Sequence, residues 1–169
     1  MTGRAWQIVA AVVGAVIGIV AVHYLGLNAL IPALSVAACW WAFTRLGVHR
    51  RLALPLAFAG GHGIWFLVGI VMALAIGGSV HSIIEIGLET LIVAAIVAWV
   101  YASQSKPSLL VLIAYEAVSI IFNAVTFTGV DDALRAVIAI HVALRIVAIV
   151  GAVVALTHRA EFAPESGTR

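Results

Sequence analysis

Long uninterrupted apolar segments are the feature that most constrains this 169-residue chain. A helix rises about 1.5 Å per residue, so about 20 apolar residues cross the roughly 30 Å hydrocarbon core of a bilayer. Six segments meet this requirement, and short breaks rich in glycine, serine or charged residues separate most of them. The segments are residues 6–25, 27–46, 52–76, 80–102, 108–127 and 134–156.

The composition excludes a water-soluble fold. Hydrophobic residues make up 64% of the chain and charged residues 9%, whereas soluble domains carry about 25% charged residues. We therefore predict an all-α fold, a polytopic membrane helical bundle with about six transmembrane helices. Residues 1–157 are expected to form this single bundle, and residues 158–169 a short, disordered cytoplasmic tail. This leaves no room for an appended catalytic or DNA-binding domain.

Positively charged residues at alternate connections predict the topology. Because Lys and Arg in short loops are retained on the cytoplasmic side, both termini are expected to be cytoplasmic, in a bacterial cytoplasmic membrane. The residues assigned to the cytoplasmic side are Arg4, Arg45, Arg50, Arg51, Lys106 and Arg159. The opposite connections, which carry Asn28, Ser79, Asp131 and Asp132, are expected to face outside.

The net charge and the single cysteine exclude two further classes of protein. The net charge of +2 comes mostly from residues at helix ends, so it reflects topology and argues against a nucleic-acid partner. Cys39 has no second cysteine to join, which excludes an internal disulfide and a thiolate-rich metal site. The expected partners are the lipid bilayer and a cation or small-molecule substrate. A homo-oligomer and a larger membrane complex both stay open.

Ionisable side chains inside the predicted spans are the candidate functional residues, because each costs about 2.5 to 3.5 kcal/mol at the centre of a span. His81, Glu85 and Glu89 follow one another at four-residue steps in the span 80–102. This spacing places them along one face of a helix, about 6 Å apart in rise. The span therefore carries a polar stripe that descends from its beginning toward its centre.

Two further spans carry polar groups with helical spacing. Glu116, Ser119 and Asn123 return to nearly the same face of the span 108–127, because their steps are three and four residues. His141 and Arg145 stand four residues apart in the last span. Both patterns predict polar groups that face the interior of the bundle.

The third span contributes His62, which lies in the glycine-rich segment 60–63 and has free space beside its imidazole. Counted from the span ends, the groups near the bilayer midplane are His62, Glu89, Glu116 and Arg145, and those in the outer half are His81, Glu85, Asn123 and His141. We predict that four helices converge on an acidic, histidine-containing cavity that opens outward and ends near the midplane. Its carboxylates outnumber its one deep arginine, so it suits a cation or proton better than an anion.

Structural roles compete with this interpretation. A pairing of Arg145 with Glu89 or Glu116 that only holds the helices together is as well supported as a functional role, since buried charges usually pair, and such a pair is compatible with a site beside it. His81 lies close to the membrane surface, where a solvated side chain is the simpler reading. The residues expected to cap the last helix are Asp131 and Asp132.

The favoured function is a membrane transporter or a solute-binding membrane subunit for a cation, a proton or a small solute. Proton-exchanging carboxylates and histidines are typical of such pathways. The predicted binding residues are His62, Glu85, Glu89, Glu116, Asn123, His141 and Arg145.

Three alternatives remain. An intramembrane metalloenzyme or hydrolase would hold a divalent metal, although no His-Glu-x-x-His segment and no serine with a credible triad occurs. A haem b electron carrier would use His62 and His141 as axial ligands. An assembly subunit would use its polar groups only to join helices. The metal-ligand candidates are His62, His81, Glu85 and His141, and the catalytic candidates are Glu85, Glu89 and Glu116.

Overall fold

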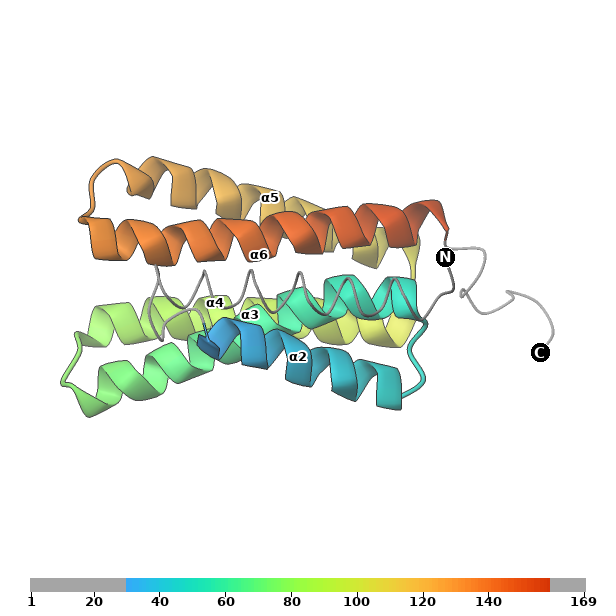
Figure 1. Cartoon of the computed structure of the whole chain (residues 1–169), viewed down its shortest axis with the longest axis horizontal. Coiled ribbons are helices and arrows are strands. Elements are labelled where there is room, and N and C mark those ends of the chain that lie inside the picture. Colours follow the sequence, from blue (N-terminus) through green and yellow to red (C-terminus); the bar gives the residue numbers. More distant parts are fainter. Residues whose placement is uncertain (1–29, 159–169) are drawn as a thin grey trace, which may run out of the picture.

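The computed structural model describes residues 30–158, which form five α-helices joined by short turns (Figure 1). No strand occurs within these residues, so the all-α prediction is confirmed for them. The predicted first span, residues 6–25, and the predicted tail beyond residue 158 lie outside the described residues. The helices are α2 (Leu30–Arg45), α3 (Arg50–Ala75), α4 (Val80–Ser103), α5 (Lys106–Phe127) and α6 (Asp132–Thr157).

Four of the five helices are long and apolar enough to cross a membrane. Their apolar stretches in α3, α4, α5 and α6 are between 22 and 26 residues long, against about 20 needed for the hydrocarbon core. Helix α2 is equally apolar in character but has 16 residues within the described part of the chain. This architecture is that expected of a multi-pass integral membrane protein.

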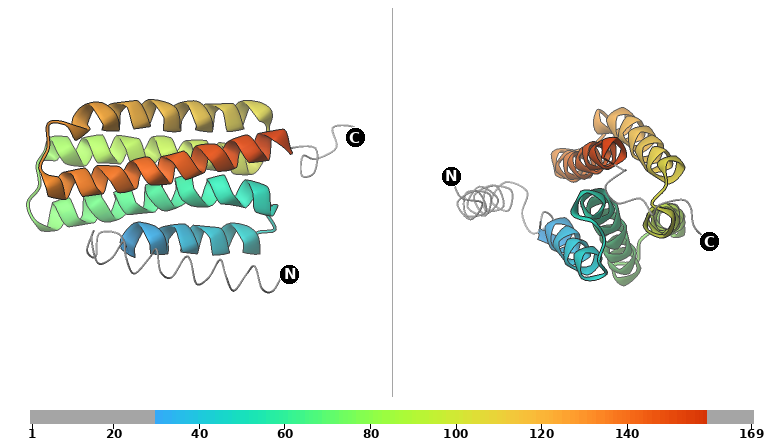
Figure 2. Two further views of the ribbon diagram at one scale, coloured as in Figure 1. Left: turned by 45° about the horizontal axis from the view of Figure 1, so that its top comes forward. Right: turned by 90° about the vertical axis from the view of Figure 1, so that its right-hand side faces the viewer.

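The helices lie side by side and successive helices run in opposite directions (Figures 1 and 2). Helix α3 packs against α2, α4 and α6, and α6 packs against α3 and α5. Helices α4 and α5 touch each other much less closely. The central pair of the bundle is therefore α3 and α6, and the sparsest seam is that between α4 and α5.

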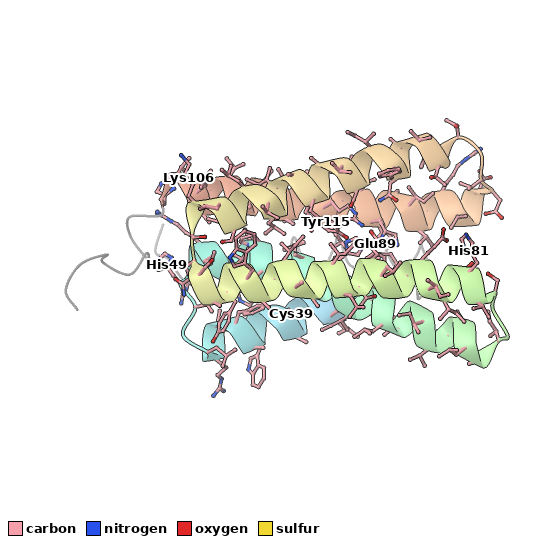
Figure 3. All side chains as sticks on the ribbon, turned by 180° about the vertical axis from the view of Figure 1, so that it is seen from behind. Cys39, His49, His81, Glu89, Lys106 and Tyr115 are labelled. Atoms are coloured by element: carbon pink, nitrogen blue, oxygen red, sulfur yellow. The ribbon has the colours of Figure 1, made fainter. Side chains whose placement is uncertain are left out.

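The two ends of the bundle differ in charge. His49 and Lys106 lie at one end, which we call the basic end, and His81 lies at the other, the acidic end (Figure 3). The basic end also carries the arginines of the turn from α2 to α3, and the acidic end carries Asp131 and Asp132 before α6. Within residues 30–158, the residues assigned from sequence to opposite sides of a membrane thus gather at opposite ends of the bundle.

Polar side chains fix where the helices begin. The Ser79 hydroxyl accepts a hydrogen bond from the backbone N–H of Ser82 at the start of α4. Asp131 Oδ1 accepts one from the backbone N–H of Leu134, 2.8 Å away, which confirms its predicted capping role. The turn between α3 and α4 uses Gly77, whose φ of +73° lies in the left-handed region that favours glycine.

The hydrophobic core occupies the half of the bundle nearest the basic end. It is built from the inward faces of α3, α4, α5 and α6, with several alanines that bring α6 close to α3. Figure 2 shows these four helices surrounding a common axis. The core residues are Val48, Leu52, Ala53, Leu56, Ala59, Ile96, Val100, Leu109, Leu112, Ala152 and Ala155.

Candidate functional site

A buried arginine joins three helices midway along the bundle. Arg145 of α6 donates a hydrogen bond from Nη1 to Glu116 Oε2 of α5, at 2.8 Å. It donates another from Nη2 to Glu89 Oε1 of α4, at 2.5 Å. We call these three residues the charged triad. The predicted pairing of Arg145 is confirmed, and the arginine pairs with both glutamates rather than with one.

Tyr115 completes the surroundings of the charged triad. Its hydroxyl donates a hydrogen bond to Glu89 Oε1 at 3.3 Å, so this oxygen receives both the tyrosine and the arginine. The Arg145 guanidinium carbon also lies 5.5 Å from the centre of the Tyr115 ring, a cation–π distance. Figure 3 shows Glu89 and Tyr115 near each other in the middle of the bundle, at the seam between α4 and α5.

The two carboxylates of the triad differ in accessibility. The side chain of Glu116 is 1% exposed and that of Arg145 2%, whereas the side chain of Glu89 is 37% exposed. Glu89 is therefore the accessible end of the triad and Glu116 its enclosed end.

The inward face of α4 is covered on one side of the triad and open on the other. Val93, Ile96 and Val100 are buried and follow Glu89 on this face toward the basic end. In the opposite direction, Glu85 on the same face has a side chain that is 64% exposed. The same change occurs along α5, where Leu109 and Leu112 are buried and Phe127 is exposed. The triad thus lies where the packed half of the bundle ends.

The polar stripe of α4 continues from the triad to the acidic end. His81 Nε2 lies 3.1 Å from Glu85 Oε1, one helical turn beyond Glu89. The side chain of His81 is exposed, in agreement with its reading as a solvated residue. His81, Glu85 and Glu89 thus stand at successive turns of α4, and Glu89 alone of the three contacts Arg145.

A second polar contact joins α3 to α6. His62 Nε2 and His141 Nδ1 are in direct hydrogen-bonding contact, and we call these residues the histidine pair. The ring of Trp65 stacks on that of His141 with centres 4.1 Å apart, and Phe66 lies against both imidazoles. His62 is almost fully buried. The pair is therefore held in an aromatic setting one turn of α6 from Arg145.

The predicted convergence of α3, α4, α5 and α6 on one level follows from these contacts. On α6, Arg145 reaches the carboxylates of α4 and α5, and His141 reaches α3. Asn123 is not part of either cluster: it lines a pocket of about 410 Å³ between α5 and α6. His81 and Glu85 form their own exposed pair. The predicted binding residues therefore fall into the charged triad, the histidine pair, an outer pair and one separate amide.

The metal-ligand candidates named from sequence lie in two separate pairs among the described residues. Zinc takes four ligands, and no group of three or more His, Cys, Asp or Glu side chains within residues 30–158 is placed to hold a metal ion. His62 and His141 form one pair, and His81 and Glu85 another. The imidazoles of the histidine pair touch each other directly, which leaves no space between them for a porphyrin.

Three contributors to the site were missed by the sequence analysis. Trp65 and Phe66 stand three and four residues after His62, the spacing that puts side chains on one helix face, so helical periodicity pointed to both. Tyr115 precedes Glu116 and points toward α4, while Glu116 points toward α6. Only the packing of the helices shows that the adjacent residues Tyr115 and Glu116 both contact members of the charged triad.

The charges of the triad do not balance when both carboxylates are ionised. Two negative groups share one positive group in a site where Glu116 and Arg145 are shielded from solvent. An uncompensated charge costs most where it is shielded from solvent, so one proton or one monovalent cation bound beside Glu116 would balance the enclosed part of the triad. Glu116 Oε1 has no hydrogen-bond partner and is the free oxygen at the enclosed end.

Comparison with known proteins adds no relative. No protein-family model, curated protein sequence or solved structure matches this chain. The candidate function therefore rests on the chemistry of the charged triad and its surroundings.

Proposed function

We propose that this chain is a membrane protein that binds a proton or small cation at the charged triad and transports it. The observation that carries the proposal is the sharing of one buried guanidinium, that of Arg145, between Glu89 and Glu116. The excess carboxylate makes the triad a binding site for one positive charge. Because Glu89 is more exposed than Glu116, the site has an accessible end and an enclosed end.

The route of entry in this proposal follows the polar stripe of α4. His81 and Glu85 are exposed at the acidic end, and Glu85 stands one helical turn before Glu89. Carboxylates and histidines that line a membrane helix are typical of proton and cation pathways. The hydrophobic core on the other side of the triad closes the route in this conformation, so release toward the basic end requires the helices to move.

The proposed topology places the acidic end outside and the basic end in the cytoplasm, with both termini cytoplasmic. The positive residues of the turns at the basic end support this orientation. In this scheme residues 6–25 add a further span to the described helices and bring the total to six. The bacterial cytoplasmic membrane stays a prediction from sequence.

Proton flux into vesicles tests the proposed function. The purified protein is reconstituted into liposomes that contain a pH-sensitive dye, and a potassium diffusion potential drives protons inward. We expect flux from the wild type and at least a tenfold lower rate from Glu89→Gln, which removes the accessible carboxylate. Glu116→Gln removes the excess charge and is expected to have a similar effect. Replacing external sodium by choline, which leaves the potassium gradient unchanged, distinguishes a sodium-coupled flux from a proton flux.

Asp132→Asn is the matched control, because Asp132 is exposed at the acidic end and pairs with Arg135 outside the triad. It is expected to retain wild-type flux. Transport is contradicted if the wild type gives no flux, either with external sodium or without it. An unchanged rate in folded Glu89→Gln protein would instead remove the triad from the pathway and leave its charges with a structural role.

A further inference from the structure

The pocket between α5 and α6 has a mostly apolar wall with one polar group. Its volume is about 410 Å³. The small side chains of Ala139 and Ala143 of α6 leave this space open. Asn123 of α5 lines the same pocket, and its Nδ2 atom is buried without a hydrogen-bond partner. A buried amide donor without a partner destabilises the protein. The pocket therefore favours a molecule that is apolar over most of its length and accepts one hydrogen bond.

The position of Asn123 along the bundle limits which molecules could bind in the pocket. Glu116 pairs with Arg145 between antiparallel helices, so Asn123, seven residues later, lies level with Ile138, seven residues earlier. Seven residues of helix correspond to about 10 Å, which puts Asn123 well above the charged triad on the acidic side. The half-thickness of the hydrocarbon core is about 15 Å. With the triad at the predicted midplane, the amide lies about 5 Å inside the level at which lipid chains join their ester groups.

The length of the pocket agrees with a lipid chain. On α6 the pocket extends from Ile138 to Ile146, a rise of about 12 Å of helix, toward the predicted bilayer midplane. Phe127 and Ala124 of α5 line its side near the acidic end. A chain that begins at Asn123 and follows α6 would end beside the level of the triad.

We propose that this pocket binds one acyl chain of an ester-linked membrane lipid, with Asn123 donating a hydrogen bond to the ester carbonyl. Because Nδ2 is buried in this conformation, the proposal requires the amide group to turn about the Cβ–Cγ bond of Asn123 until Nδ2 faces the pocket. The carbonyl then satisfies the amide, and the alanines of α6 accommodate the chain. The inference requires the bundle to lie in a bilayer, and it is independent of the proposed transport of cations.

The test compares ester lipids with ether lipids, which have the same chains and headgroup but lack the carbonyl. The whole protein is placed in nanodiscs that contain equal amounts of diacyl and dialkyl phosphatidylcholine. Lipids retained after transfer to detergent are counted by native mass spectrometry. The wild type is expected to retain the ester lipid about threefold to tenfold over the ether lipid, the range that corresponds to one hydrogen bond.

Two variants distinguish the contribution of the Asn123 hydrogen bond from that of the pocket volume. Asn123→Leu keeps the volume but removes the donor, so its ester-to-ether ratio is expected to fall to about one. Ala143→Phe fills the pocket, and it is expected to lose the retained lipid of either kind. Ser119→Ala removes a polar group of α5 that does not line the pocket, and it is expected to behave as the wild type.

Either of two results would overturn the proposal. One is a wild-type ratio of one, which would show that no carbonyl is recognised. The other is an unchanged ratio in Asn123→Leu or unchanged retention in Ala143→Phe, which would place the retained lipid elsewhere. Loss of proton flux in the triad variants has no bearing on these ratios, so the two proposals fail separately.

Discussion

Nη1 of Arg145 lies 2.8 Å from Oε2 of Glu116, and both side chains are almost completely removed from the surface. A pair of this kind does not add much stability by itself, because desolvation of the two ions offsets most of their attraction. Removing one partner is strongly destabilising, because it leaves the other charge without a partner in the interior. Glu89 increases the cost of removing the arginine, because it places a second carboxylate on the same guanidinium.

Arg145→Met is therefore expected to destabilise the protein strongly. Without the guanidinium, Glu89 and Glu116 face each other with no positive group, and breaking a buried ion pair in this way costs about 3 to 5 kcal/mol. The thermal unfolding of detergent-solubilised protein measures the effect.

Arg135→Met is the control for this change, because Arg135 pairs with the exposed Asp132 at the acidic end. Surface ion pairs contribute little, so its unfolding temperature is expected to stay close to that of the wild type. The double variant Arg145→Met with Glu116→Gln is expected to recover part of the loss, because the one carboxylate it leaves is that of Glu89, which is partly exposed. Equal unfolding temperatures for the two arginine variants would contradict the role of the triad in stability.

Gly61→Ala is expected to disturb the packing of α2 on α3. A Cβ atom on Gly61 would lie 2.7 Å from backbone atoms of Val36, which is too close for any side chain to relieve. The helices would have to separate, with a loss of about 1 to 3 kcal/mol typical of overpacking. The expected result is a lower unfolding temperature in detergent.

Gly69→Ala is the matched control, since it lies on the same helix and a Cβ atom there meets nothing within 4 Å. Alanine favours a helix over glycine by about 0.5 to 1 kcal/mol, so this variant is expected to be as stable as the wild type or more stable. The close approach of α2 to α3 would be disproved if both substitutions shifted the unfolding temperature equally.

Sequence periodicity predicted the helices and much of the polar site. Four spans correspond closely to α3, α4, α5 and α6, because breaks such as Gly77 and the capping Asp131 have local physical causes. The predicted span 27–46 corresponds to α2 over the part that the structure describes. Depth counted from span ends also brought the charges of the triad to one level, since the rise per residue of a helix is fixed.

What periodicity could not supply is the rotation of each helix about its own axis. His62 and Asn123 were both assigned to one cavity, yet one pairs with His141 and the other lines a pocket between α5 and α6. The separation of His81 and Glu85 from the histidine pair has the same origin. Side-chain partners depend on which faces meet, and that is decided by packing between helices far apart in the chain.

The histidine pair predicts a coupling between α3 and α6. His62→Phe keeps an aromatic ring beside Phe66 but leaves Nδ1 of His141 without its partner, which costs about 1 to 3 kcal/mol. His62→Phe with His141→Phe removes both polar groups and is expected to cost less than the two single changes added together. A double-mutant cycle on the unfolding temperatures measures this coupling, and strict additivity would show that the two imidazoles do not interact.

The proposed topology predicts which end of α6 an impermeant thiol reagent reaches. Cys39→Ser first removes the only cysteine, and a single new thiol is then introduced by Gly129→Cys at the acidic end or Thr157→Cys at the basic end. Both positions are exposed. In intact cells the charged maleimide is expected to label the chain altered at position 129 and to label the chain altered at position 157 only after lysis. The reverse pattern would invert the bundle, and the proposed pathway would then begin in the cytoplasm because the exposed stripe of His81 and Glu85 lies at the same end as residue 129.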